Sequence, residues 1–247
     1  MVLESCSLTL FLNGVLQGRP EDIWGALGLP GPESVNARPV DKSAVVLASD
    51  ESYAYMLSVG PGRLDLSLRG TAKDVHQEKQ GNLFGLIDFE KAFARVREIL
   101  DALAKLEFNV EINRVAVQAN AVWNEDSLKS ANAIVLQRFP YLTSQAADLT
   151  DLAVQGNEHA TSETVGETQF NLLQQWAVVQ QQAMVVLFGS LPLPKTASAP
   201  MWLVRGTMDF NTSPAVDVKW PLATAYKLQS ELFERVTTKY REWAREK

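Results

Sequence analysis

Apolar and polar residues alternate along several segments of the chain, and a period of two is typical of strands with one buried face. The clearest example is residues 63–68, in which leucine occupies every second position. Residues 53–59 precede it across the sequence Gly60-Pro61-Gly62, so the two segments are predicted to form a hairpin. Residues 5–16 are predicted to form a first strand, followed by a short helix over 21–27 that starts just after a proline.

A change of parity marks the segment 110–123. Val110 and Ile112 are apolar on one parity, whereas the apolar positions from Val115 onward fall on the other. A shift of one residue exchanges the two faces of a strand, so an intact strand here must accommodate an extra residue. We therefore predict a β-bulge near Asn113-Arg114.

Apolar residues at steps of three and four predict three long helices, each with one apolar stripe. The first spans 88–106 with Asp88 as its N-cap, and the second spans 124–138 with Asn124 as its N-cap. The third spans 222–245.

Three antiparallel strands are predicted between residues 169 and 212. They are centred on 170–178, 184–188 and 202–210, and in an alternative interpretation the first two form a single helix, because glutamine and leucine suit both states. Long helices separate the strands, and no glycine-rich turn joins a strand to a helix. This arrangement favours an α+β fold, a mostly antiparallel sheet with two or three long helices packed on one face.

Composition narrows the class of protein further. The 247 residues are 46% hydrophobic, so we expect a single domain over 1–247, with an N-terminal subdomain over 1–81 as the alternative. With 23 basic and 29 acidic residues the formal charge is −6, which argues against direct binding of nucleic acid. The single cysteine, Cys6, is typical of a reducing compartment. Since the sequence has neither a basic signal segment nor a long apolar run, we expect a cytoplasmic protein that does not bind membranes.

Sequence motifs of catalysis and cofactor binding are not found in the chain. It contains no Gly-x-Ser-x-Gly turn and neither of the glycine-rich loops that hold phosphates. We therefore assign no catalytic residue, no metal and no cofactor, and we favour a protein without enzymatic activity. The alternative is a metal-dependent hydrolase that uses Asp209 together with Glu158 and His159. On a helix, Glu163 would lie one turn from His159 and could share the ion.

Two predicted strands carry polar residues opposite their apolar positions. These residues are Arg114, Gln118 and Asn120 in the first strand and Arg205, Thr207, Asp209 and Asn211 in the second. If the strands are neighbours, the side chains share one face of the sheet, where guanidinium groups can hold a carboxylate or a phosphate. The alternative is a face wetted by solvent, on which arginine and aspartate pair across the strands.

Trp243 is a further candidate interaction residue. It lies on the last turn of the final helix, between Glu242 and Arg245, where a large ring is hard to bury. A terminal helix with an aromatic end suits docking of a partner or of a second copy. Fraying of the helix end into solvent is the alternative.

Three segments carry a resemblance to known proteins. They are the strand 112–120 with its spaced arginine and asparagine, the strand end Met208-Asp209-Phe210-Asn211, and the helix over 228–243. In these segments the chain resembles a family of sporadically distributed, functionally uncharacterised bacterial proteins of about this length. Gln118 stands where the family usually has a second basic residue. The resemblance implies a genomic neighbourhood of mobile elements or phage defence and supplies no catalytic residue.

The leading hypothesis is a non-catalytic cytosolic protein that works by binding, through self-association or as a subunit of a bacterial multi-protein complex. We expect a protein partner or a second copy, no direct contact with nucleic acid and no contact with membranes. Besides the hydrolase, the alternative is a sensor of small anions that uses Arg114 and Arg205.

Overall fold

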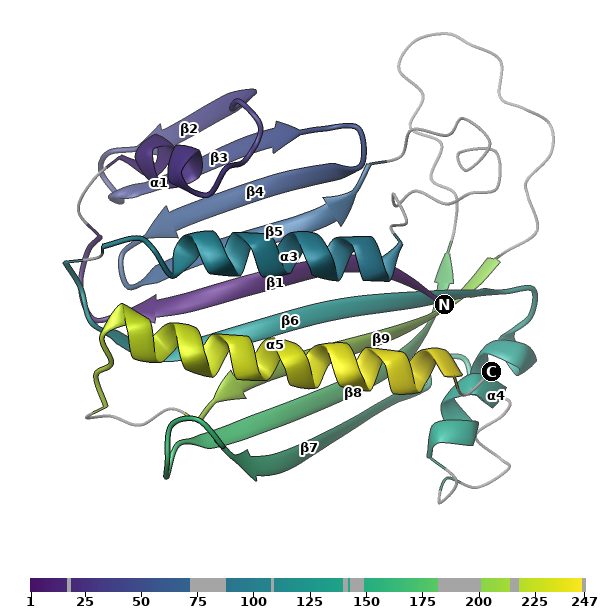
Figure 1. Ribbon diagram of the computed structural model, residues 1–247. Coiled ribbons are helices and arrows are strands. Elements are labelled where there is room, and N and C mark those ends of the chain that lie inside the picture. The colour runs from purple at the N-terminus through teal and green to yellow at the C-terminus, as the bar shows by residue number, and fades with distance from the viewer. Residues whose placement is uncertain are drawn as a thin grey trace, which may run out of the picture.

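One antiparallel sheet of nine strands organises the described part of the chain in the computed structural model (Figure 1). The structure describes residues 1–16, 19–71, 88–107, 109–139, 142, 149–181, 201–213 and 218–245. The strands are β1 (Val2–Leu12), β2 (Ser34–Arg38), β3 (Ser43–Ser49), β4 (Tyr53–Gly60), β5 (Arg63–Gly70), β6 (Ile112–Glu125), β7 (Ala153–Thr161), β8 (Gln169–Gln181) and β9 (Met201–Thr212). Their order is β2-β3-β4-β5-β1-β6-β9-β8-β7, so β1 joins the N-terminal hairpins and the C-terminal strands into one sheet.

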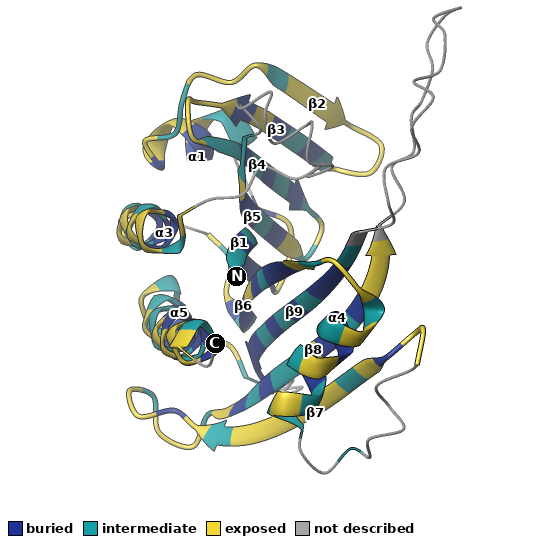
Figure 2. Cartoon of the chain, turned by 90° about the vertical axis from the view of Figure 1, so that its right-hand side faces the viewer, coloured by how far each residue is buried: buried dark blue, intermediate teal, exposed yellow. Residues whose placement is uncertain are grey.

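The four described helices all pack on the same face of the sheet, which we call the helix face. They are α1 (Pro20–Ala26), α3 (Phe89–Leu103), α4 (Leu128–Arg138) and α5 (Leu222–Arg245). Figure 2 shows α3 and α5 side by side along the middle of the sheet, with α1 beside β3 and β4. The α+β class is confirmed, although the described helices number four rather than two or three. None of them is both long and apolar enough to cross a membrane.

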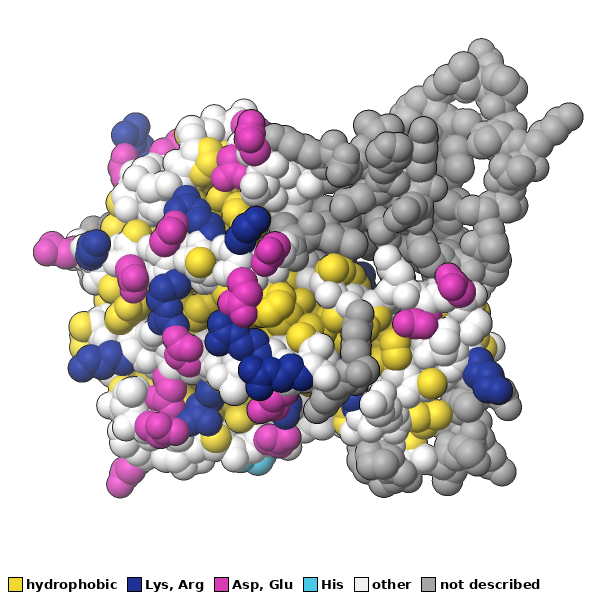
Figure 3. Space-filling view, turned by 45° about the vertical axis from the view of Figure 1, so that its right-hand side comes forward, with side chains coloured by type: hydrophobic (Ala, Val, Ile, Leu, Met, Phe, Trp, Pro, Cys, Tyr) yellow, Lys and Arg dark blue, Asp and Glu magenta, His cyan; other side chains and the backbone are white. Residues whose placement is uncertain are grey.

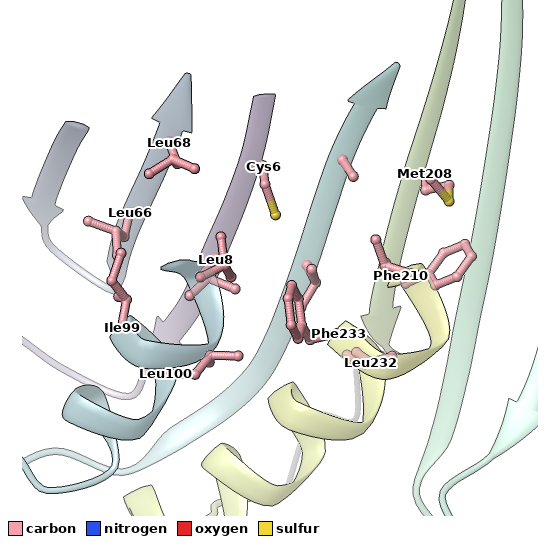
Figure 4. Close-up of a cluster of buried hydrophobic side chains, with 14 of the residues drawn as sticks. Cys6, Leu8, Leu66, Leu68, Ile99, Leu100, Met208, Phe210, Leu232 and Phe233 are labelled. Carbon is pink, nitrogen blue, oxygen red and sulfur yellow. The ribbon is translucent and has the colours of Figure 1, made fainter. Parts of the chain in front are cut away.

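The hydrophobic core fills the space between the helix face and these helices. Along α5, the predicted stripe of Leu228, Leu232, Val236 and Tyr240 is completely buried. Figure 4 shows side chains of β1, β5 and β9 interleaved with side chains of α3 and α5. Removal of this apolar surface from water drives the helices onto the sheet.

Charged side chains cover the outer surfaces of α3 and α5. A guanidinium nitrogen of Arg241 lies 2.8 Å from the Glu90 carboxylate, and Arg97 pairs with Glu234. Figure 3 shows basic and acidic side chains interspersed over this side of the molecule. Since exposed ion pairs each contribute about 0–1 kcal/mol, the packing of the two helices depends mainly on their apolar stripes.

The N-caps of α3 and α4 differ in how well the sequence predicts them. Asp88 caps α3 as predicted, because its carboxylate accepts hydrogen bonds from the backbone N–H groups of Glu90 and Lys91. The prediction that Asn124 caps α4 is wrong. Asn124 belongs to β6, which pairs with β9 through this residue and keeps it extended, and Ser127 caps the helix instead.

Most strand predictions hold in the N-terminal half of the chain. β4 and β5 form the predicted hairpin. The predicted bulge is confirmed as well, because Phe11 pairs with Arg114 and Leu12 with Ile112, which leaves Asn113 without an opposite residue in β1. The first strand ends at Leu12 rather than at residue 16, because the chain turns at Gly14, where φ is 137°.

The structure of the C-terminal strands decides between the strand and helix interpretations of the region that begins at residue 169. β8 is a strand throughout, so the helical interpretation is wrong for its described part, and β9 is the predicted third strand. The predicted middle strand, 184–188, lies outside the described residues. The sequence does not predict β7, because its polar residues fall on both parities and it forms an exposed edge of the sheet.

A cluster of three tryptophans fixes the end of α5. Trp243 is only 3% exposed and packs against Trp176 and Trp123, with ring centroids 4.2 and 6.3 Å away. The expectation that Trp243 resists burial and is free to dock a partner is therefore wrong. Gly206 of β9 makes room for the ring, since a Cβ atom there would lie 2.8 Å from Cζ3 of Trp243. Arg138 stacks on the cluster, with its guanidinium carbon 4.4 Å from the centroid of the Trp176 ring.

Substitution of Gly206 by alanine tests this packing. The added methyl group overlaps the Trp243 and Trp123 rings, so we expect Gly206→Ala to lower the free energy of unfolding by about 1–3 kcal/mol, measured by chemical denaturation. Gly156→Ala in β7 is the matched control, because no heavy atom lies within 4 Å of the added Cβ and its effect should be near zero or slightly stabilising. Equal losses in the two variants would contradict the account of the tryptophan cluster.

The connection between β7 and β8 is held by one carboxylate of α5. Glu231 accepts hydrogen bonds from the hydroxyl groups of Ser162 and Thr164, at 2.7 and 2.8 Å, and from the backbone N–H of Glu163 at 3.0 Å. Arg235 also donates to it, at 3.0 Å. Burial acts to raise the pKa of Glu231, but these hydrogen bonds outweigh it and lower the pKa to about 2.

This lowered pKa predicts a specific acid sensitivity. A carboxyl group whose folded pKa lies below its ordinary value of 4.5 contributes stability above that pH and loses it as the pH falls toward 2. We expect the free energy of unfolding of the native protein to fall more steeply from pH 4.5 to pH 2 than that of Glu231→Gln, by up to about 3 kcal/mol. Glu51→Gln, which changes an exposed carboxylate, should leave the slope as it is. Parallel curves for all three proteins would refute the role of Glu231.

Candidate binding site on the uncovered sheet face

The second face of the sheet, which we call the open face, points away from the described helices. Side chains alternate between the two faces along each strand, so the residues opposite the core positions point here. On β6 these are Arg114, Gln118 and Asn120, and on β9 they are Arg205, Thr207, Asp209 and Asn211. Strands β6 and β9 are neighbours, so the structure brings these predicted site residues onto one face.

A row of polar side chains crosses five adjacent strands of the open face, and we call it the polar row. Its members are Arg69, Ser5, Asn120, Thr207 and Gln175, each directly opposite the next in the strand register. The Thr207 hydroxyl donates to Asn120 Oδ1 at 2.9 Å, and Asn120 Nδ2 donates to Ser5 Oγ at 2.9 Å. The centre of the row is therefore fixed by hydrogen bonds between strands.

The polar row forms the floor of a cavity of about 780 Å³, which we call the hollow. The rest of its lining is Glu4, Ala54, Gly70, Ala177, Val179 and Arg205. Ala54 belongs to β4 and Val179 to β8, with four strands between them, so the open face must be concave here. Figure 2 looks along the twisted sheet and shows how far β4 and β8 are turned relative to one another.

A second bulge directs a carboxylate into the hollow. Leu3 pairs with Ala121 and Ser5 with Asn120, so Glu4 is the extra residue of β1. Because a bulge redirects side chains and increases local twist, Glu4 reaches the open side. There its carboxylate accepts a hydrogen bond from Arg205 at 3.1 Å.

The lining of the hollow carries an excess of positive charge. Arg69 and Arg205 contribute two guanidinium groups and Glu4 one carboxylate, so the formal balance is +1. The Arg69 side chain is exposed and makes no hydrogen bond or ion pair with the described residues. Its forked donors are therefore not used by any described residue, and a guanidinium fork of this kind suits a carboxylate acceptor.

The other end of the open face has its charges matched internally. Arg114 donates to Asn211 at 2.9 Å, and Asn211 in turn donates to Asp209 at 3.0 Å. Arg63 pairs with Asp65 at 2.6 Å. Both guanidinium groups also stack on the ring of Phe11, at 5.0 and 5.2 Å. The Arg114–Asn211 contact joins β6 to β9, whereas Arg63–Asp65 and Asn211–Asp209 each lie within one strand. These contacts engage donors of both arginines within the protein itself.

The predicted site residues thus separate into two groups. Asn120, Arg205 and Thr207 line the hollow, whereas Arg114, Gln118, Asp209 and Asn211 lie outside it. Trp243 is buried on the helix face. Arg205 pairs with Val122, which is eight residues from Arg114 along β6, or about 27 Å at roughly 3.4 Å per residue. Arg114 and Arg205 therefore cannot hold one small anion together.

The proposed hydrolase residues do not meet in the structure. Consecutive residues of a strand point to opposite faces, and Glu158 lies on the helix face near Gln174, while His159 and Asp209 lie on the open face with β8 between them. Glu163 pairs with Arg235 instead. Among the described residues, no group of three histidine, cysteine or acidic side chains is placed to hold a metal ion.

Sequence reasoning missed four polar residues of the hollow: Glu4, Ser5, Arg69 and Gln175. Arg69 has a signal in the sequence, since it continues the polar parity of the predicted hairpin arm at 63–68. Its position beside Ser5 follows only from the placement of β1 between β5 and β6, which joins residues far apart in the chain. No pattern in the sequence predicts the bulge that redirects Glu4.

Comparison with protein-family models and with curated proteins finds no match to the chain.

Proposed function

We propose that this chain is a non-catalytic binding protein of the cytosol, a subunit of a bacterial assembly that holds a carboxylate-bearing segment of a partner protein in the hollow. The observation that carries the proposal is the hollow itself, with Arg69, which no described residue engages, at one end of a polar floor. A volume of about 780 Å³ lies within the usual range of ligand sites. The resemblance to a family found near phage-defence loci suggests a defence complex as the assembly.

The charge of the hollow favours a carboxylate over a phosphate. Its formal balance of +1 matches a single negative charge, which a guanidinium fork recognises through two parallel hydrogen bonds. A phosphate group carries close to two charges at neutral pH. Glu4 would repel the second charge and would compete for Arg205.

The remaining lining favours a small apolar group next to that carboxylate. Ala54 lies beside Arg69 in the strand register and gives that end of the hollow an apolar surface. Ala177 and Val179 line the opposite end, where Val179 is 43% exposed. Burial of such a surface by a ligand is favourable by about 25 cal/mol per Å². The ligand expected from this chemistry is a carboxylate with a short aliphatic neighbour, as at an acidic side chain or at the C-terminus of a protein segment.

The polar groups of the floor are arranged for binding rather than for chemistry. Asn120 accepts from Thr207 and donates to Ser5, so both of its polar atoms are already engaged. Glu4, the carboxylate of the lining, is paired with Arg205 and is not positioned as a base for the Ser5 hydroxyl. A fixed floor of this kind supports recognition, because little side-chain entropy is lost on binding.

Loss of the Arg69 guanidinium should weaken recognition of the charged group. We expect N-acetylvaline to raise the melting temperature of the native protein, and Arg69→Ala to weaken its binding about 10- to 100-fold, as expected for loss of a charge-assisted hydrogen bond. N-acetylvalinamide, which has the same shape without the charge, should not bind. Arg63→Ala is the matched control, since Arg63 lies on the same strand and face but outside the hollow.

Two results would contradict this proposal. Equal binding of the acid and the amide would remove the role of charge, and equal losses in Arg69→Ala and Arg63→Ala would place the ligand elsewhere. Native mass spectrometry of the protein isolated from its own host then identifies the source of the carboxylate. A second protein chain of a different mass supports the assembly. A bound small acid would contradict the protein partner, although the hollow would remain the binding site.

A further inference from the structure

The two edges of the sheet differ in how they are protected against pairing with another chain. β2 is five residues long, contains Arg38 at its end and is followed directly by Pro39. Short length, positive charge and proline are devices by which edge strands avoid association. β7 has nine residues, contains neither lysine, arginine nor proline, and pairs with β8 in a continuous register without a bulge.

The hydrogen bonds of β7 show which backbone groups face outward. The N–H of Val178 donates to Leu152 O and the N–H of Ser162 donates to Thr168 O, so the even-numbered residues of this segment bond to β8. In an antiparallel pair, bonded residues alternate with residues whose N–H and C=O point the other way. The odd-numbered residues of β7, from Ala153 to Thr161, therefore direct their backbone groups away from the sheet.

This free edge has no partner strand among the described residues, because β7 is the last strand of the sheet order. Figure 1 shows it along the lower border of the sheet. The side chains along it are exposed or only half-buried. The outward backbone donors and acceptors of β7 are therefore not paired with any described strand.

We infer that β7 pairs with β7 of a second copy of this chain, antiparallel and about a two-fold axis through Asn157. This register brings all nine residues of both strands into the ladder. It places odd-numbered residues opposite odd-numbered residues, so Asn157 meets Asn157 and Gln155 meets His159. The outward N–H and C=O groups then find each other, and the interface is self-complementary, as a two-fold dimer requires.

The side chains are compatible with this register. The acidic residue of β7, Glu158, lies opposite Gly156 of the other copy, which has no side chain. The two Glu158 side chains become diagonal neighbours, about 7–8 Å apart in a regular sheet. Their repulsion is weakened by salt, so the dimer should be tighter at moderate than at low ionic strength.

The pairing also has a consequence for the hollow. A two-fold axis perpendicular to a continuous sheet keeps both open faces on the same side. The two hollows of the dimer would therefore face the same partner, and a partner with two suitable segments would bind with avidity. The dimer itself does not depend on the proposed function of the hollow.

A charge placed on the two-fold axis tests the register directly. Asn157→Lys and Asn157→Asp each put two like charges opposite one another in the dimer, and like-charge contacts disfavour association. We expect sedimentation equilibrium at low salt to show a dimer for the native chain. Each variant alone should dissociate at least about tenfold more readily. An equimolar mixture of the two variants should form a dimer again, because lysine then faces aspartate.

Asn36→Lys is the matched control, since Asn36 is an exposed asparagine on the open side of the other edge strand. It should dimerise as the native chain does. A monomeric native chain, a dimeric Asn157→Lys variant, a mixture that stays monomeric, or dissociation caused by Asn36→Lys would each overturn the inference. The mixture also excludes misfolding, because unfolded variants would not recover the dimer.

Discussion

The burial of α5 against the centre of the sheet is the constraint on which the rest of the structure depends. The helix contributes a continuous apolar stripe from Leu228 to Tyr240, and one polar side chain within it sets its position. Gln229 is fully buried, and its amide nitrogen donates to the backbone oxygens of Thr9 and Ala116, at 3.2 and 3.3 Å. These two residues face each other in β1 and β6. A helix shifted by one turn would leave a buried amide without its partners, which costs about 1–3 kcal/mol.

The position of the helices on one face determines the chemistry of the other. A strand buried on both faces would be apolar at every position, whereas β1, β6 and β9 alternate, with serine, threonine, asparagine and arginine on the open face. Two register shifts along the β1–β6 pair, at Glu4 and at Asn113, bracket this polar surface. Bulges increase twist, and the hollow lies beside the first of them. The concave shape and the placement of the Glu4 carboxylate thus have one structural cause.

Local patterns in the sequence predict features that depend on a single strand or helix. The bulge at Asn113 follows from a parity change, and the cap at Asp88 from the start of an apolar stripe. Features that depend on which strands are neighbours are harder to predict from the sequence. The open-face group on β6 and β9 was predictable because both strands carry a clear polar parity, but Arg69 joins it only through β1. Trp243 was misjudged because its space is created by Gly206, a residue with no side chain on a different element.

The two proposed contacts of this chain have complementary energetics. The floor of the hollow is organised in advance by Asn120, but Arg69 is exposed and must lose its freedom when it binds. A single carboxylate held mainly by one exposed guanidinium therefore binds weakly. The inferred pairing of two chains through β7, the last strand of the sheet, would place two such sites on a common surface without any change in either one. Because the second contact of a bivalent partner would then be intramolecular, the affinity of the proposed assembly would depend on the geometry of the edge strand as much as on the chemistry of the hollow.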